Sequence, residues 1–286
     1  MATWAIETLD SVAEMLSDKI SINKLTCESY ISTENMLPEK GGVEKASKLP
    51  SSGNVNAFCP GDVLFSNIRT YFKKVWLAPW HGGASADVIV FRPRDSQIID
   101  SQFLFYFLSS DAFVNSTVTA SKGTKMPRGD KDAMRNYELS LPPLPTQQKI
   151  VSVLSAYDDL IENNQRRIKI LEEIAQNLYQ EWFVKFRFPG HETANFVDSP
   201  LGKIPEGWEV TKLEEACTLN YGRALKKDDR CGGKIPVYGS SGIIGAHDSK
   251  LVEGPGIILG RKGNVGSVYW CDKDFFVIDT VACTPN

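Results

Sequence analysis

Three clusters of basic residues are the side chains of this sequence best suited to bind a ligand. One lies among aromatic residues at 65–76, one lies at 121–135, where glycines indicate a loop, and one lies at 221–234. Arg261 and Lys262 are additional candidates. Such clusters neutralise nucleic-acid phosphates, although short basic runs are also common on ordinary solvated surfaces. The candidates are Arg69, Lys73, Lys74, Lys122, Lys125, Arg128, Arg223, Lys226, Lys227, Arg261 and Lys262.

Patterns for catalysis, nucleotide binding or metal binding have little support. His81, His191 and His247 lie at unrelated positions, and a lone histidine is weak evidence for catalysis. The glycine-rich stretches 239–245 and 260–266 match neither GxGxxG nor a phosphate-binding loop, so we interpret them as hairpin turns. The six cysteines form no CxxC pair. We therefore predict free thiols, no metal site and no catalytic residue.

One long helix is predicted from Thr146 to Phe188, a stretch without glycine or proline. Thr146 is a suitable N-cap after Pro145, and Pro189 followed by Gly190 provides the stop. At about 1.5 Å per residue this helix would be roughly 60 Å long, so it should project and need a partner. Apolar residues alternate at intervals of four and three, which is typical of a coiled-coil seam. The predicted pairing positions are Ile150, Leu154, Tyr157, Ile161, Asn164, Ile168, Leu171, Ala175, Leu178 and Trp182.

The sequences on either side of this helix resemble each other. In both, a tryptophan is followed five positions later by a leucine, at 4 and 9 and at 208 and 213. Strand-like segments then follow in the same order, aligned on Pro-Gly pairs and on Asp87 and Asp279. These segments are 60–66, 75–78 and 87–91 in the first copy, and 255–260, 268–271 and 279–283 in the second.

An internal repeat of this size predicts two copies of one domain. We expect an α+β fold in which each copy is a twisted sheet with short helices. The first copy would occupy residues 1–145, the helical spacer 146–190 and the second copy 191–286. Because Asn286 matches a position near Pro93 of the first copy, we expect the second copy to be incomplete.

The overall composition is that of an ordinary globular protein, with 42% hydrophobic and 23% charged residues. The net charge of -3 produces no general attraction to nucleic acid, so any such binding must come from local clusters. The sequence contains neither a long apolar run nor the features of a secretory signal. A cytoplasmic protein without membrane contact is the expectation.

Two motifs resemble the specificity subunits of type I restriction-modification systems. PPLP at 142–145, followed by Gln147, Ile150 and DDLI at 158–161, resembles the central region of that family. LGKIPEGW at 201–208 is similar to the beginning of its target-recognition domains. The resemblance covers the whole chain and implies two target-recognition domains separated by a long coiled-coil helix. The sequence departs from the family pattern because the end of the second domain and the second helix are missing.

The resemblance implies a non-catalytic subunit that recognises a split sequence in double-stranded DNA. It also implies docking to methyltransferase (modification) subunits and to a restriction translocase-nuclease subunit. Because the chain has no methyltransferase motif, S-adenosylmethionine, ATP and Mg are expected on those partners, with no cofactor here. The long helix would act as a spacer between two reading domains. Two alternatives remain open: a coiled-coil assembly protein that binds no DNA, and a half-subunit that self-pairs through the helix on a palindromic split site.

Overall fold

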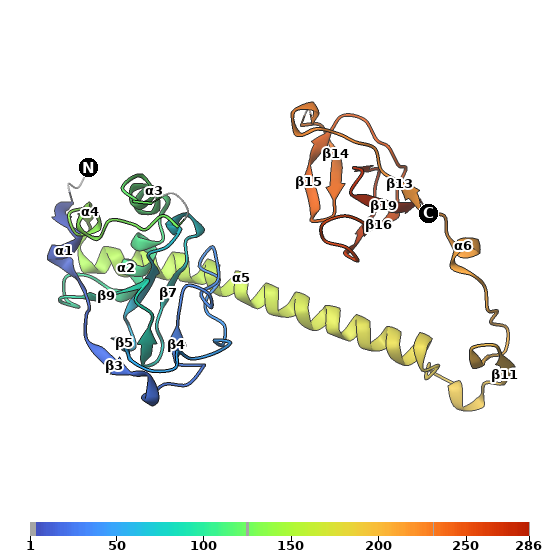
Figure 1. Cartoon of the computed structure of the whole chain (residues 1–286), viewed down its shortest axis with the longest axis horizontal. Coiled ribbons are helices and arrows are strands. Elements are labelled where there is room, and N and C mark those ends of the chain that lie inside the picture. The colour runs from blue at the N-terminus through green and yellow to red at the C-terminus, as the bar shows by residue number, and fades with distance from the viewer. Residues whose placement is uncertain (1–3, 124–125, 231, 286) are drawn as a thin grey trace. The chain divides into compact units, whose positions relative to one another are not determined.

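The computed structural model describes residues 4–123, 126–230 and 232–285 (Figure 1). The chain divides into two compact units, unit 1 at residues 1–172 and unit 2 at residues 173–286. Both units combine β-sheets with short helices, which confirms the predicted α+β class. Over these described ranges, no helix has both the length and the apolar character needed to cross a bilayer.

Unit 1 is built from two four-stranded sheets and a two-stranded ribbon in its described part. The strands are β1 (Ala5–Thr8), β2 (Ala13–Met15), β3 (Lys19–Ser21), β4 (Tyr30–Ile31), β5 (Asn54–Phe58), β6 (Val63–Ser66), β7 (Val75–Leu77), β8 (Gly82–Ala84), β9 (Val88–Pro93) and β10 (Glu138–Leu141). One sheet has the order β2-β9-β6-β7 and is antiparallel throughout. The other has the order β3-β5-β8-β4, with β4 and β8 parallel, and the ribbon joins β1 to β10.

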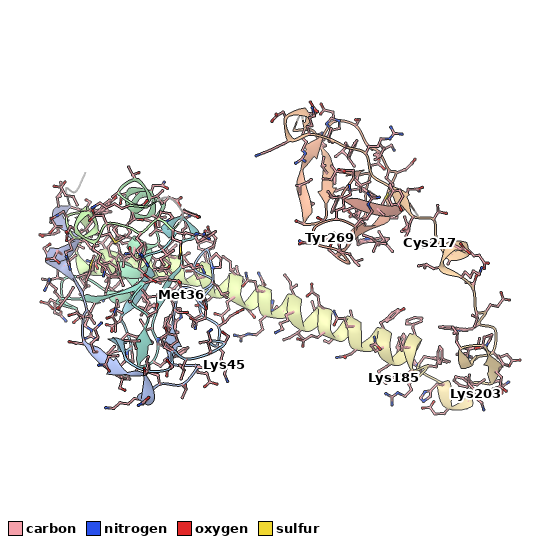
Figure 2. The ribbon with its side chains drawn as sticks, viewed as in Figure 1. Met36, Lys45, Lys185, Lys203, Cys217 and Tyr269 are labelled. Atoms are coloured by element: carbon pink, nitrogen blue, oxygen red, sulfur yellow. The ribbon has the colours of Figure 1, made fainter. Side chains whose placement is uncertain are left out.

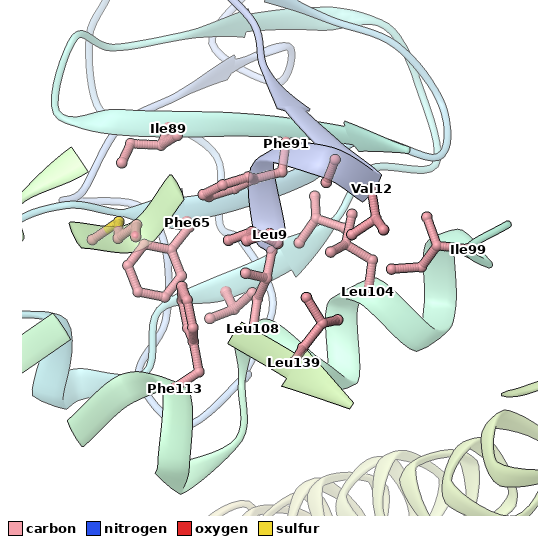
Figure 3. Close-up of a cluster of buried hydrophobic side chains, with 14 of the residues drawn as sticks. Leu9, Val12, Phe65, Ile89, Phe91, Ile99, Leu104, Leu108, Phe113 and Leu139 are labelled. Carbon is pink, nitrogen blue, oxygen red and sulfur yellow. The ribbon is translucent and has the colours of Figure 1, made fainter. Parts of the chain in front are cut away.

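The β2-β9-β6-β7 sheet is apolar on both faces, because alternate residues of a strand point to opposite sides. Leu64 and Val90 point toward the other sheet and join one buried cluster. Phe65 and Phe91 point the opposite way and pack with Leu104 in a second cluster, shown in Figure 3. The helices on that side are α1 (Leu9–Val12), α2 (Ser101–Leu108), α3 (Asp111–Thr119) and α4 (Lys131–Arg135).

Side-chain caps determine where the short helices begin. Asp100 Oδ1 accepts hydrogen bonds from the backbone nitrogens of Gln102 and Phe103, at 2.8 and 3.0 Å, at the start of α2. Asp130 caps α4 in the same way. The loop predicted for 121–135 therefore ends at Asp130, because this cap allows residues 131–135 to form a helical turn.

Helix α5 (Leu144–Tyr179) begins two residues before the predicted start. Pro145 is accommodated in its first turn, where a backbone N–H would have no helical acceptor. The carbonyl of Pro143 accepts hydrogen bonds from the backbone nitrogens of Thr146 and Gln147, at 2.8 and 3.1 Å. Thr146 is therefore inside the helix, and its predicted role as the N-cap was wrong.

The helical path also ends earlier than predicted. A π-helical turn, Gln180–Val184, follows α5, and Phe186 then adopts a left-handed backbone with φ of 56°. This change of direction precedes the predicted stop at Pro189 and Gly190. The reason is local packing of Phe186, whose ring contacts Trp208 and Phe196 at centroid distances of 5.4 and 6.2 Å.

Gln147 attaches the beginning of α5 to unit 1. Its side chain is fully buried, and its Nε2 donates hydrogen bonds to the carbonyls of Ile98 and Pro142, both at 2.8 Å. Its Oε1 accepts a hydrogen bond from the backbone nitrogen of Asp100 at 2.9 Å. One side chain thus connects the helix to the segment before α2 and to the end of β10.

Unit 2 contains a smaller version of the same two-sheet arrangement in its described part. Its strands are β11 (Phe196–Ser199), β12 (Gly202–Pro205), β13 (Asn220–Tyr221), β14 (Ile235–Gly239), β15 (Gly242–His247), β16 (Gly256–Gly260), β17 (Val268–Cys271), β18 (Phe276–Val277) and β19 (Val281–Pro285), with helix α6 (Leu213–Ala216). The order β13-β19-β16-β17 repeats the order β2-β9-β6-β7 of unit 1. A three-stranded sheet, β15-β14-β18, lies beside it.

The repeat predicted from the sequence is confirmed by these orders, but its alignment changes by one residue. Ile258 points into the core of unit 2 and pairs with Tyr269, as Leu64 does with Trp76 in unit 1. Leu64 is therefore the counterpart of Ile258. Alignment on the Pro-Gly pairs would instead match Leu64 with Leu259. A one-residue slip places every side chain on the wrong face of a strand, so side-chain direction decides the register.

The outer face of the β13-β19-β16-β17 sheet remains exposed. Val268 is 63% exposed, whereas its counterpart Val75 is 1% exposed beneath the helices of unit 1. Likewise Leu213 of α6 is 71% exposed, and its counterpart Leu9 is 1% exposed. The difference arises because the described part of unit 2 contains no helices in the place of α2, α3 and α4.

We predict that Gln147→Ala lowers the free energy of unfolding of unit 1 by about 2–4 kcal/mol, because it leaves three backbone groups, one buried and two partly buried, without their partner. Gln148→Ala is the matched control, since Gln148 is the neighbouring residue on the same helix and its side chain is exposed. Urea denaturation of the full chain measures both. Equal stability of the two variants would contradict the role given to Gln147.

Candidate nucleic-acid interface

The first two basic clusters of the sequence meet at the end of β6. A short hairpin closes where Lys122 and Arg128 exchange two backbone hydrogen bonds, at 2.9 and 3.0 Å. This hairpin lies along the segment after β6, because Ile68 forms a bridge with Arg128 and the nitrogen of Arg69 donates to the carbonyl of Pro127 at 2.9 Å. Lys125 lies outside the described residues.

A third segment, the turn before β9, joins the same place. The backbone nitrogen of Asn67 donates to the carbonyl of Asp87 at 2.8 Å, and the nitrogen of Gly129 donates to the carbonyl of Asn67 at 3.1 Å. Gly129 packs so closely against Asn67 and Met134 that a Cβ at this position would overlap them. Three segments far apart in the sequence are therefore held together by main-chain hydrogen bonds.

Within the first cluster, Arg69 is the only residue whose charged group has no hydrogen-bond or ion-pair partner among the described residues. Its backbone is left-handed, with φ of 50°, and its side chain is exposed. Lys73 instead forms ion pairs with Asp111 at 2.5 Å and Glu39 at 3.6 Å, and its hydrogen bond to Asp111 raises the pKa of its ammonium group. Lys74 Nζ donates to the carbonyl of Thr33 at 2.7 Å. These contacts indicate structural roles for Lys73 and Lys74.

The second cluster provides Lys122 and Arg128, both of which are paired and still exposed. Lys122 Nζ lies 2.5 Å from Asp130 Oδ2, and this hydrogen bond raises the pKa of Lys122 and lowers the pKa of Asp130. Arg128 contacts the carboxylate of Asp87. We call Arg69, Lys122 and Arg128, which lie on adjoining backbone segments, the basic surface of unit 1.

Unit 2 places basic residues at the equivalent position. The backbone nitrogens of Arg261 and Lys262 donate to the carbonyl of Thr280 at 2.9 and 3.0 Å, the same connection that joins Asn67 to Asp87 in unit 1. Lys262 Nζ lies 3.3 Å from Asp279 Oδ2. The guanidinium of Arg261 lies over the ring of Tyr221, with its central carbon 4.5 Å from the ring centroid.

The third cluster of the sequence lies partly beside this pair. The backbone nitrogen of Gly222 donates to the carbonyl of Val281, and that of Arg223 donates to the carbonyl of Val277, at 3.3 and 3.0 Å. These bonds bring Arg223 to the strand end that carries Arg261 and Lys262, and we call these three residues the basic surface of unit 2. Lys226 and Lys227 are exposed at the start of the next 3-10 turn, Lys227–Asp229, which Lys226 precedes.

The sequence analysis used Asp87 and Asp279 only to align the repeat and gave no binding role to them or to Tyr221, the first residue of the third cluster. The signal that places the two aspartates beside the cations is their position in the chain. Each lies in the turn before the last strand of its sheet, where the loop after β6 or β16 passes. Arg230, by contrast, is structural, since its guanidinium donates to the carbonyls of Ile244 and Leu225 at 3.0 and 3.4 Å.

The predicted pairing positions of α5 remain uncovered in this chain. Side chains project from all sides of the helix (Figure 2), and every residue from 161 to 180 is exposed. The face that packs on unit 1 is a different stripe, which includes Gln147, Val151 and Asp158. Of the predicted positions, Ile150 and Trp182 are half-buried, and the exposed ones are Leu154, Tyr157, Ile161, Asn164, Ile168, Leu171, Ala175 and Leu178.

A groove of about 670 Å³ separates part of α5 from the body of unit 1. Tyr106 Oη donates to Asp158 Oδ2 across it at 2.8 Å, and Lys40 Nζ lies 3.5 Å from Asp158 Oδ1. Burial and the hydrogen bond to Asp158 both raise the pKa of Tyr106. Asp158 belongs to the DDLI segment, so this motif residue connects the helix to unit 1.

Comparisons with known proteins agree with this architecture. A family model described as the type I restriction modification DNA specificity domain matches residues 3–173 and 205–284. The MjaVIII specificity subunit of Methanocaldococcus jannaschii, a type I restriction enzyme, is 33% identical over 150 residues, which cover 52% of this chain and 34% of that protein. The HindI specificity subunit of Haemophilus influenzae is 27% identical over 203 residues, which cover 65% and 42% of the two chains.

A solved structure shares the fold. The S subunit of a type I restriction-modification system from M. genitalium aligns with a TM-score of 0.59 and 17% identity, covering 98% of this chain and 72% of that one.

The chain matches less than half the length of the two curated relatives. The matched segments cover 34% of the MjaVIII subunit and 42% of the HindI subunit.

We predict that Lys74→Met destabilises the protein more than Arg69→Met, because Lys74 has a structural role and Arg69 does not. Lys74→Met removes a charged hydrogen bond to a backbone carbonyl and should lower the free energy of unfolding by about 1–2 kcal/mol. Arg69→Met should change it by less than about 0.5 kcal/mol. Urea denaturation of both variants measures these changes. A larger loss of stability in Arg69→Met than in Lys74→Met would refute the structural role given to Lys74.

Proposed function

The chain belongs to the family of type I restriction-modification specificity subunits, and we propose that it recognises DNA sequence for such an enzyme without catalysing a reaction itself. The observation that carries the proposal is the recurrence of a basic surface at the same strand end in both units. A chain with two equivalent surfaces is suited to a split target, in which each unit reads one half-site.

Two kinds of contact would combine on these surfaces. Exposed cations such as Arg69 and Lys122 would neutralise phosphates, which supplies affinity that weakens with salt. Arginines such as Arg128 and Arg261 would lie closer to the bases, because base edges carry the sequence information. The exposed rings of Tyr71 and Phe72, 48% and 38% exposed, flank the unit 1 surface and offer additional apolar contact.

Helix α5 would provide the docking surface for the rest of the enzyme. Its 36 residues give it a length of about 54 Å, and its exposed seam needs an apolar partner. We propose that methyltransferase subunits, and through them a restriction translocase-nuclease subunit, assemble at this helix. S-adenosylmethionine, ATP and Mg would then act on those subunits.

A second candidate function is favoured by the same seam. Two copies of the chain could pair through α5 and read a palindromic split site with unit 1 alone. The exposed outer face of the unit 2 sheet favours this alternative, because the described part of unit 2 has no helices that cover this face as α2, α3 and α4 do in unit 1. An assembly protein that binds no DNA is the remaining candidate.

Co-expression with a type I methyltransferase subunit, followed by mapping of methylated adenines in the host genome, distinguishes these functions. We expect a split motif with two different half-sites, because both units carry a basic surface. A split palindrome would instead indicate pairing of two copies. Absence of methylation by a complex shown to be intact would exclude the proposed function and favour the assembly protein.

Charge reversal tests the basic surface of unit 1 directly. We predict that Arg69→Glu combined with Lys122→Glu weakens duplex DNA binding by the assembled complex at least about tenfold at low salt and makes the salt dependence less steep. Lys24→Glu is the control, since Lys24 follows β3, which lies far from α3 and α4 in unit 1 (Figure 1). Equal binding by both variants in a fluorescence anisotropy titration would exclude this surface.

A further inference from the structure

We propose that Arg128 binds the major-groove edge of a guanine and that Asp87 orients its guanidinium for this contact. The proposal rests on the proposed function and assigns a base to one residue of the unit 1 surface. Arg128 is thereby a specificity-determining residue, and Asp87 is its positioning residue.

The guanidinium of Arg128 is held on one side only. Its Nε donates to Asp87 Oδ1 at 3.1 Å, and its Nη2 lies 3.0 Å from the same oxygen. Nη1 forms no hydrogen bond or ion pair with any described residue, and the side chain is 56% exposed. The terminal edge of the guanidinium, formed by Nη1 and the second hydrogen of Nη2, thus remains available to two acceptors at once.

Guanine presents two acceptors of the required kind. Its N7 and O6 atoms lie side by side in the major groove, and a bidentate arginine is the commonest contact to them. The other bases do not present that pair of acceptors, since adenine has a donor next to N7. A guanidinium with one edge bound to a carboxylate and the other edge free therefore selects guanine.

The backbone beneath this pair is unusually constrained. The backbone N–H and carbonyl of Arg128 both form hydrogen bonds with Lys122. The residues on either side of it, Pro127 and Gly129, form backbone hydrogen bonds with the segment after β6. Asp87 is joined to that same segment, because its carbonyl accepts from the nitrogen of Asn67. Arg128 and Asp87 consequently start from one hydrogen-bonded framework, and their ion pair already restricts the arginine side chain, which reduces the entropy that it would lose on binding.

The other cations of this surface lack these features. Arg69 has no carboxylate partner among the described residues, so its guanidinium has no fixed orientation. Lys122 has a carboxylate partner in Asp130, but an ammonium group is a point charge without the planar fork that recognises two acceptors. Both side chains suit phosphate contacts, which are insensitive to sequence.

Unit 2 carries a different ion pair at the equivalent strand end. Lys262, in the loop after β16, lies 3.3 Å from Asp279 in the turn before β19. By strand register Asp87 corresponds to Thr280, and the described part of unit 2 has no counterpart of the segment that carries Arg128. The assignment of guanine to Arg128 therefore concerns the half-site read by unit 1.

The test compares Arg128→Lys with the unchanged chain in the complex with methyltransferase subunits, by mapping methylated adenines. The unchanged complex should show a fixed G·C pair at one position of a half-site. Arg128→Lys keeps the charge and removes the fork, so it should still methylate the original motif while preference at that single position falls about ten- to a hundredfold. Asp87→Asn should weaken the same preference to a smaller extent.

Lys122→Met is the matched control, because Lys122 lies opposite Arg128 on the same hairpin and also pairs with an aspartate. It should lower methylation at all sites and leave the motif unchanged. An unchanged motif in Arg128→Lys, or an equal loss at all sites, would overturn the assignment of guanine to Arg128. If the intact unchanged complex methylates nothing, the proposed function itself fails, and this inference fails with it.

Discussion

Burial of both faces of the β2-β9-β6-β7 sheet is the constraint on which the rest of unit 1 depends. Leu64 and Val90 require the second sheet on one side, and Phe65 and Phe91 require the helices on the other. With both faces covered, only the strand ends and their loops are left to contact a ligand. The basic surface lies at one of these ends, where the loop after β6 meets the turn before β9.

Unit 2 shows which parts of this arrangement depend on the covering layers. Its sheet keeps the same strand order although Val268 and Trp270 are exposed on the outer face. The connection from Arg261 to Thr280 is nevertheless present, because it is a main-chain hydrogen bond that follows from the pairing of β16 with β19. The basic surfaces therefore depend on strand register, whereas burial of the outer sheet face, seen in unit 1 and absent from the described part of unit 2, depends on the covering helices.

Helix α5 has two faces with different tasks. Gln147 and Asp158 attach one face to unit 1 through hydrogen bonds to the carbonyls of Ile98 and Pro142 and to the hydroxyl of Tyr106. The predicted seam occupies a neighbouring stripe and stays exposed from Leu154 to Leu178. This separation allows unit 1 to hold the helix while the apolar stripe stays exposed.

Periodicity and local chemistry alone determined the α+β class, the repeated domain, the long helix and the positions of the basic clusters. Local signals suffice for these features because side-chain spacing reports directly on helix and strand faces. Tertiary structure decided which cations are free, since Lys73 and Lys74 find partners far away in the sequence at Asp111 and Thr33. It also decided the one-residue register of the repeat and the pairing of Arg128 with Asp87, because both depend on contacts between segments that no local pattern records.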